Sequence, residues 1–219
     1  MTDKAPVIAI DGPSGSGKGT VAKLVAQRLG FRYLDSGALY RAVALAALEQ
    51  GIPWEDEESV ARLAAALDLN FEGERVLLHG KDVALRIRDE ELSAGASEVA
   101  AHPKLRQSLL AHQRAFRKAP GLVAEGRDMG SVIFPDAVLK IFLTASIAER
   151  AKRRYKQLRE KGMHANLGNL LRDLAERDQR DSNRAAAPLV KSTDAIVIDT
   201  TGSSIAEVVA MIMEHYAAR

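Results

Sequence analysis

The sequence contains no cysteine among its 219 residues. This absence excludes disulfide bonds, catalysis by a thiol and metal sites built from thiolates. No apolar run approaches the roughly 20 residues that a membrane-spanning helix requires. Residues 1–6 also lack an apolar, signal-like segment before the first predicted strand. We therefore expect no membrane partner, and a cytoplasmic enzyme is the simplest interpretation.

The chain carries little charge of either sign in excess. Its formal net charge of +2 argues against non-specific binding to nucleic acid as the main activity. Its 47% hydrophobic and 27% charged residues are typical of a globular protein with one substantial core. The five histidines show no metal-ligand spacing, and no Ser-His-Asp or Cys-His set is present.

A glycine-rich run separates a predicted strand at residues 7–11 from a predicted helix at residues 21–29. The run comprises Gly12, Pro13, Ser14, Gly15, Ser16, Gly17, Lys18, Gly19 and Thr20. Strand, glycine loop, lysine and helix in this order are typical of a phosphate-binding P-loop. Glycines let several backbone N–H groups turn toward one point, and the helix N-terminus adds unpaired N–H groups. Since Lys18 adds a positive charge for the β- and γ-phosphates, the run predicts a polyphosphate site rather than an ordinary glycine turn.

The loop departs from the common pattern at one position. Gly19 follows Lys18, where the common form has serine or threonine, and Thr20 comes next. This leaves open whether Thr20 contacts Mg²⁺, a metal-bound water or only a phosphate. The run is not a dinucleotide-binding fingerprint, because the spacing counted from Gly15 requires glycine at position 20.

Short apolar runs predict the strands of a sheet. These runs lie at residues 7–11, 31–34, 122–125, 138–143 and 195–199. Because helical patterns separate them, we predict an α/β fold with a parallel sheet core and helices on both faces. The stretch at about residues 54–116 breaks this alternation and predicts an inserted subdomain. Within it, residues 75–79 and 83–88 predict a β-hairpin, with an earlier turn at 72–74.

Kinases, ATPases, GTPases and motors all use P-loops, so other residues must distinguish among them. A guanine-specific switch would need an N-K-x-D motif, which is absent. The D-x-x-G match at Asp199–Gly202 follows the last predicted strand, where a turn into the final helix explains it.

Arginines gather near the predicted strand ends and on the helices that follow. Arg150, Arg153 and Arg154 share one helix face by their spacing, and Arg177 and Arg184 share another. Any one of these arginines alone would be interpreted as a solvated surface charge. Together they favour transfer of a phosphoryl group between two anionic substrates, because guanidinium pairs bidentately with phosphate.

Four blocks of the sequence together resemble bacterial cytidylate kinases, a family of nucleoside monophosphate kinases. The blocks are the glycine-rich run, residues 34–41 with D-S-G-x-x-Y-R, residues 125–130 with G-R-D-M-G, and residues 176–184. They occur in the family's order and span nearly the whole chain. The resemblance implies that the chain transfers the γ-phosphoryl group of ATP to CMP or dCMP in pyrimidine nucleotide metabolism. It further implies Mg²⁺ as cofactor and a monomer.

The resemblance also assigns regions and residues. It implies a P-loop core at about residues 1–53, 117–150 and 167–219, a monophosphate-binding insert at about 54–116, and a short lid at about 151–166. The implied acceptor-binding residues are Ser36, Arg41, Ser97, Arg106, Arg127, Asp128, Arg177 and Asp181. The implied catalytic residues are Lys18, Arg127, Arg150, Arg153, Arg154 and Arg184.

In these assignments, the acceptor phosphate is surrounded by Ser36, Arg41, Arg127 and Arg177. Ser97, Arg106 and Asp128 contact cytosine, and Asp181 with Arg177 lies near the sugar.

Three features keep alternative interpretations. Glu125, at a strand end, either holds a magnesium-bound water or is a turn carboxylate, and the same alternatives apply to Asp11. Asp128 either accepts a hydrogen bond from the cytosine amino group or is a turn residue. The segment at 159–166 is either a mobile lid or a surface loop.

For the whole chain, the alternatives are another small-molecule P-loop kinase and a nucleotide-dependent switch without an acceptor.

Overall fold

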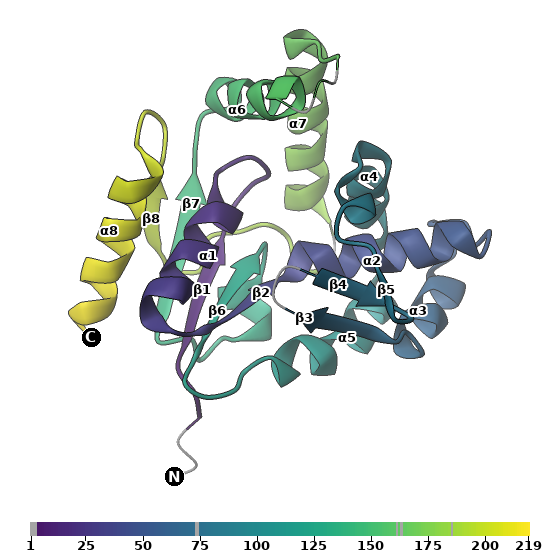
Figure 1. Cartoon of the computed structure of the whole chain (residues 1–219), viewed down its shortest axis with the longest axis horizontal. Coiled ribbons are helices and arrows are strands. Elements are labelled where there is room, and N and C mark those ends of the chain that lie inside the picture. The colour runs from purple at the N-terminus through teal and green to yellow at the C-terminus, as the bar shows by residue number, and fades with distance from the viewer. Residues whose placement is uncertain (1–3, 73–74, 161, 163, 185) are drawn as a thin grey trace. The chain divides into compact units, whose positions relative to one another are not determined.

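The computed structural model describes residues 4–72, 75–160, 162, 164–184 and 186–219 (Figure 1). The chain forms two compact units. The first unit comprises Met1–Leu34 and Phe116–Arg219, and the second comprises Asp35–Ala115.

A five-stranded sheet forms the centre of the first unit, in the order β2-β6-β1-β7-β8. The strands are β1 Val7–Asp11, β2 Arg32–Asp35, β6 Leu122–Gly126, β7 Leu139–Thr144 and β8 Ile196–Asp199. Strand β1 pairs in parallel with β6 and β7, and β7 pairs in parallel with β8. Since every residue of β1 and β6 is buried, both faces of the sheet are covered. The predicted α/β class with a parallel sheet is confirmed.

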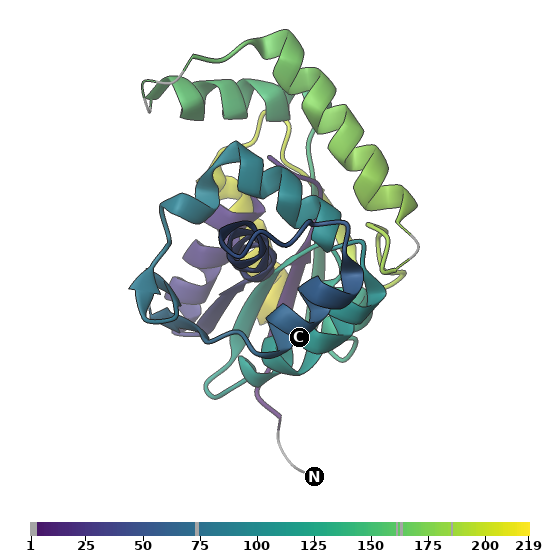
Figure 2. The ribbon, with the colours of Figure 1, turned by 90° about the vertical axis from the view of Figure 1, so that its right-hand side faces the viewer.

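The helices of the first unit are α1 Lys18–Leu29, the π-helix η2 Met129–Ile133, α6 Ile147–Glu160, α7 Leu167–Asn183 and α8 Ile205–Ala217. On one face of the sheet, α1 and α8 share an apolar core with β1 and β7 that includes Ile8, Ile141 and Ile212. Alternate strand residues face the other way, where Ala9 and Lys140 lie under Gly130 of η2. Figure 2 shows α6 leading into α7.

The second unit contains helices and a small antiparallel sheet. The helices are α2 Ser36–Glu49, α3 Glu57–Ala65, the 3-10 helix η1 Arg86–Arg88, α4 Glu90–Val99 and α5 Pro103–Ala115. The strands are β3 Leu69–Glu72, β4 Arg75–Leu78 and β5 Lys81–Asp82, in the order β3-β4-β5. A core that includes Tyr40, Val60, Val99 and Leu105 joins α2, α3, α4 and α5.

The prediction that residues 83–88 form the second strand of a hairpin was wrong. His79 and Gly80 both have positive φ, 47° and 75°, so they form a tight turn that pairs Leu78 with Lys81. Strand β5 then ends at Asp82, whose side chain accepts the N–H of Ala84 at 3.0 Å. The alternating apolar and charged residues beyond it mimic a strand pattern but include the 3-10 helix η1.

Two predicted features include residues outside the described part of the chain. The turn at 72–74 contains Gly73 and Glu74, and the lid at 151–166 contains Lys161 and Met163. The second unit begins at Asp35, whereas the predicted insert begins at about residue 54. The division into core, insert and lid stays a prediction.

Candidate active site

The glycine-rich run joins the end of β1 to the start of α1. Gly12 has a φ of 153°, and a Cβ there would lie 2.0 Å from the carbonyl oxygen of Leu143 on β7. Gly15 has a φ of 76°, and a Cβ there would lie 3.1 Å from the Cβ of Arg150 on α6. The loop therefore passes against β7 and α6 at positions where a side chain does not fit.

Lys18 is buried at the first turn of α1. Its Nζ donates a hydrogen bond to the Pro13 carbonyl oxygen at 3.1 Å and lies 3.9 Å from Oε2 of Glu125. The Tyr33 hydroxyl donates to Oε1 of Glu125 at 3.1 Å. No sequence pattern pointed to this contact of Tyr33, which follows from β2 lying beside β6 in the sheet.

The chain's own residues fit a magnesium ion that is held mainly by water and phosphate. Oε1 of Glu125 lies 3.0 Å from the position of a Cβ on Gly19, so the carboxylate lies against the backbone beside Thr20, which is exposed. In the described part of the chain, no group of three or more His, Cys, Asp or Glu residues could hold a metal by itself. Mg²⁺ usually binds through one or two carboxylates, several waters and substrate phosphates, so this donor set suits it.

Asp11 ties the end of β1 to the turn that contains Asp128. Its two carboxylate oxygens accept the N–H groups of Met129 and Gly130, each at 2.8 Å. Both oxygens therefore already hold backbone donors, which argues against the prediction that Asp11 holds a magnesium-bound water. Burial raises the pKa of Asp11 to about 6, although the two backbone hydrogen bonds lower it. The nearby charge of Asp128 raises this pKa further, and the charge of Lys18 lowers it.

The raised pKa of Asp11 predicts how stability changes with pH. The folded protein binds this proton more tightly than the unfolded chain, whose pKa is near 3.8. The stabilisation is therefore fully present below the unfolded pKa and is lost as pH rises through about 6. In denaturant titrations, we expect the free energy of unfolding of wild type minus that of Asp11→Asn to fall by up to roughly 3 kcal/mol between pH 4 and 7.

Asp136→Asn is the matched control for this measurement. Arg117 lowers the pKa of Asp136 through a hydrogen bond, so its contribution is lost as pH falls. Its difference from wild type should change in the opposite direction and by less, because the carboxylate is exposed. A flat difference for Asp11→Asn would contradict the assigned cause.

Two of the predicted catalytic arginines hold the loop by its backbone. Arg150 is buried, donates to the carbonyl oxygen of Ser14 at 3.0 Å, and pairs with Asp178 of α7 at 3.0 and 2.5 Å. Arg153 donates to the carbonyl oxygen of Ser16 at 3.4 Å. Arg154, the third predicted catalytic arginine on α6, donates to Gln157 of the same helix at 3.3 Å.

A second group of arginines surrounds Asp181 of α7, which is buried. Arg127 donates to its carboxylate at 2.8 Å. Burial opposes ionisation of Asp181, but the charge and hydrogen bond of Arg127, with the charges of Arg177 and Arg184, outweigh it and lower the pKa. The carboxylate thus interacts with three arginines, of which sequence spacing had placed only Arg177 and Arg184 on one helix face. Arg184 also donates to the carbonyl oxygen of Ala187 at 2.5 Å.

The second unit brings together Asp35, Ser36 and Arg41 at the start of α2. Asp35 caps this helix by accepting the N–H of Ala38 at 3.0 Å, and it pairs with Arg41 at 2.8 Å. The Nε of Arg41 is buried without a hydrogen-bond partner among the described residues. A buried donor of this kind is costly unless a ligand or water satisfies it, which suits an anion site.

The remaining predicted base contacts lie on α4 and α5. Ser97 and Arg106 are both buried. The guanidinium of Arg106 stacks over the ring of Tyr40, 5.8 Å from its centroid, and donates to the carbonyl oxygen of Ala100 at 3.4 Å. Tyr40 therefore shapes the surroundings of Arg106 as well as belonging to the core.

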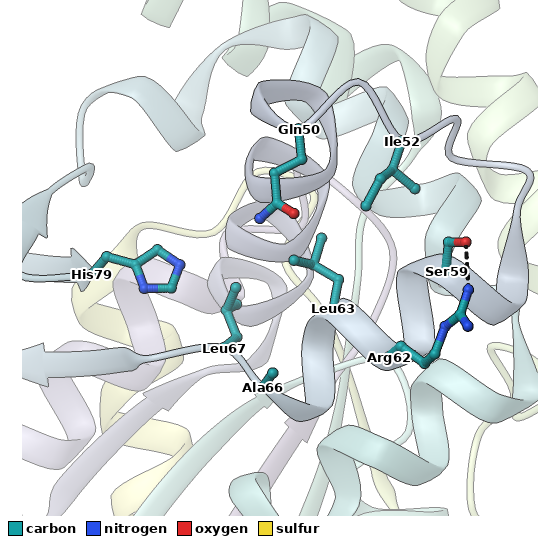
Figure 3. A pocket seen from close by; sticks show the side chains of 8 residues that line it. All are labelled: Gln50, Ile52, Ser59, Arg62, Leu63, Ala66, Leu67 and His79. Carbon is teal, nitrogen blue, oxygen red and sulfur yellow. Dashed lines mark hydrogen bonds between the residues drawn. The ribbon is translucent and has the colours of Figure 1, made fainter.

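The second unit contains a cavity of about 420 Å³, lined by Leu63, Leu67, Gln50 and His79 among others. Figure 3 shows the lining side chains. The cavity contains none of the predicted site residues. Its lining is half polar and half apolar, and Arg62 donates to the Ser59 hydroxyl at 3.1 Å. Since the residues of the predicted phosphate site lie elsewhere, at the glycine loop and the start of α1, we place the active site at the loop.

Comparison with known proteins decides the family. The sequence model of the cytidylate kinase family matches residues 8–218. The chain belongs to the cytidylate kinase family. Cytidylate kinase of Bordetella pertussis is 56% identical over 98% of this chain and 96% of the relative. Cytidylate kinase of Shewanella sediminis is 52% identical over the same shares. The family predicted from the sequence blocks, and with it the prediction of a kinase, is confirmed.

A solved structure shares the fold. An uncharacterized protein from Eubacterium ventriosum matches with a TM-score of 0.55 and 14% identity, over 98% of this chain and 99% of that chain. At this identity, the likeness concerns the fold alone. The roles of individual residues in a cytidylate kinase stay predictions, which the geometry above makes testable.

Proposed function

We propose that this chain transfers the γ-phosphoryl group of ATP to CMP or dCMP, giving ADP and CDP or dCDP. The observation that carries the proposal is the glycine loop with Lys18 lying across it and Glu125 beside it. Membership of the cytidylate kinase family supports the choice of acceptor and a role in pyrimidine nucleotide metabolism.

The donor half of the site holds ATP by its phosphates. The loop N–H groups and the N-terminus of α1 bind the phosphate oxygens, and Lys18 moves from the Pro13 carbonyl to the β- and γ-phosphates. Glu125 and Thr20 would hold Mg²⁺ through water. When bound, the ion would neutralise part of the negative charge of the phosphates. Arg150 and Arg153 keep the loop in shape from α6.

The acceptor needs orientation rather than a strong base, because a phosphate oxygen is already anionic near neutral pH. In the second unit, Ser36 and Arg41 bind the acceptor phosphate, while Ser97 and Arg106 contact the base. In the first unit, Arg127 and Arg177 bind phosphate, Asp181 orients these arginines near the sugar, and Arg154 and Arg184 stabilise the transferred group. Two features support these roles: the buried Nε of Arg41, which has no hydrogen-bond partner among the described residues, and the charge cluster around Asp181.

Asp128 gives a selectivity prediction. A carboxylate accepts a hydrogen bond from the N4 amino group of cytosine and repels the O4 of uracil. We expect Asp128→Ala to lower the ratio of kcat/KM for CMP to that for UMP by roughly 10- to 100-fold, in line with 1–3 kcal/mol per base contact. Steady-state kinetics with both acceptors measures this ratio.

Because Asp128 is buried, Asp128→Asn provides a second variant of similar volume. Its amide can also donate to uracil, so selectivity should fall further toward UMP. Selectivity equal to wild type in both folded variants would contradict the assignment of Asp128 to the base.

A direct test measures ADP formation from Mg²⁺-ATP with and without CMP. A kinase forms ADP only when CMP is present, and CDP appears in equal amount. ADP formation that is independent of any acceptor would favour the nucleotide-dependent switch. Light scattering of the purified protein tests the expected monomer. Fractionation of cells that produce the protein tests the expected cytoplasmic location.

The described residues contain no helix that is long and apolar enough to cross a membrane.

A further inference from the structure

Thr200 belongs to the D-x-x-G match that follows β8, which sequence reasoning explained as a turn. Its side chain is buried, although its neighbours Asp199 and Thr201 are exposed. Its N–H donates to the carbonyl oxygen of Thr144 at the end of β7, at 2.8 Å. Thr200 therefore lies inside the first unit, at the end of two neighbouring strands.

The Thr200 hydroxyl meets three groups from three different segments. Its oxygen lies 3.1 Å from the carbonyl oxygen of Ser16 in the glycine loop and 3.0 Å from that of Thr144. It also accepts a hydrogen bond from Nη1 of Arg153 on α6, at 3.0 Å. The single hydroxyl proton is shared between the two carbonyl acceptors, and one lone pair of the hydroxyl oxygen accepts from Arg153.

Arg153 completes the same arrangement. Its Nη2 donates to the Thr200 carbonyl oxygen at 2.6 Å, and its Nε pairs with Glu149 at 3.0 Å. Its Nη1 also reaches the carbonyl oxygen of Ser16 at 3.4 Å. Two donors from outside the loop thus converge on a single loop carbonyl.

The orientation of this carbonyl fixes the next N–H group. In a trans peptide, the C=O and N–H of one unit point in opposite directions. The Ser16 carbonyl points toward Thr200, so the Gly17 N–H of the same peptide points away from Thr200. Phosphate-binding loops depend on N–H groups in this orientation.

We propose that Thr200 is a positioning residue of the donor site, which holds the Ser16–Gly17 peptide so that the Gly17 N–H faces the phosphates of ATP. The proposal rests on the proposed function, in which the glycine loop binds ATP. Thr200 touches neither substrate in this account. It acts through the loop, and it needs only the hydroxyl, not the methyl group, of its side chain.

Three variants separate the hydroxyl from the bulk of the side chain. Thr200→Val keeps the volume and removes the hydroxyl, Thr200→Ser restores the hydroxyl, and Thr193→Val changes an exposed threonine on the loop before β8. We expect Thr200→Val to weaken binding of a non-hydrolysable ATP analogue by about tenfold, the effect of losing one hydrogen bond. KM for ATP should rise to the same extent, while KM for CMP stays within twofold. Thr200→Ser and Thr193→Val should resemble wild type.

Calorimetric titration of the analogue and of CMP against each folded variant gives the result. If Thr200→Val does not fold, Thr200→Ala replaces it in the same comparison. Unchanged analogue binding by the folded variant that lacks the hydroxyl, equal weakening by Thr200→Ser, or equal weakening of CMP binding would overturn the proposal. Wild type that binds no ATP analogue would instead overturn the proposed function, so the two failures are distinguishable.

Discussion

Replacement of Lys18 by methionine lowers kcat/KM for ATP by at least about 100- to 1,000-fold in this account, the range expected on removing one charge-stabilising donor from a reaction centre. Lys18 already lies across the glycine loop, 3.1 Å from the Pro13 carbonyl oxygen, so it needs only a local side-chain movement to reach a bound phosphate. Methionine keeps most of the length and the apolar stem but has no charge. Steady-state phosphoryl transfer from Mg²⁺-ATP to CMP measures the loss.

Lys118→Met is the matched control, because it makes the same chemical change at an exposed lysine of the first unit. It should leave kcat/KM within twofold of wild type. Removing Lys18 also leaves Glu125 without its cation at 3.9 Å, so the unfolding midpoint of both variants has to be measured. A folded Lys18→Met variant with nearly normal kcat/KM would contradict the role of the loop as the ATP site.

Substitution of Gly12 by alanine should have the second largest effect. The added Cβ would lie 2.0 Å from the backbone oxygen of Leu143, and neither backbone segment can move without displacing the loop or β7. A displacement of about 1 Å in a reacting group can cost on the order of 100-fold in rate. We therefore expect Gly12→Ala to lose at least about 100-fold in ATP affinity or kcat/KM, measured by titration and kinetics.

Gly51→Ala controls for the conformational preference of glycine. Gly51 also has a positive φ, 67°, but a Cβ there meets no atom within 4 Å. This variant should show only a modest loss of stability, of about 1 kcal/mol, and normal kinetics. If Gly12→Ala retains wild-type ATP binding, the close approach of the loop to β7 is not required for function.

Local patterns predicted the parts of the fold that depend on neighbouring residues. The apolar runs located all five strands of the main sheet to within one or two residues, because buried parallel strands read as continuous apolar segments. The S-x-x-E spacing of Ser204 and Glu207 is typical of a capping box, and a capping box forms at the start of α8. The hairpin arm at residues 83–88 failed because the tight turn at His79–Gly80 and the cap at Asp82 end the strand early.

Contacts between distant segments were beyond sequence patterns. Spacing placed Arg150 and Arg153 on one helix face, but not against the carbonyl oxygens of Ser14 and Ser16, more than 130 positions away in the chain. For the same reason, no pattern pointed to the contact of Tyr33 with Glu125, and Thr200 was explained as part of a turn. Both lie at the site only because the strand order brings β2 beside β6 and β8 beside β7.

A comparison of nucleoside monophosphates as acceptors tests most directly whether this chain phosphorylates CMP and dCMP. Purified protein is given Mg²⁺-ATP with CMP, dCMP, UMP, AMP or GMP, and ADP and the diphosphate product are quantified together. The account predicts that CMP and dCMP have the highest kcat/KM and give one CDP or dCDP per ADP. Preferred turnover of UMP, AMP or GMP would contradict the assignment of the base, and no ADP with any acceptor would contradict the kinase itself.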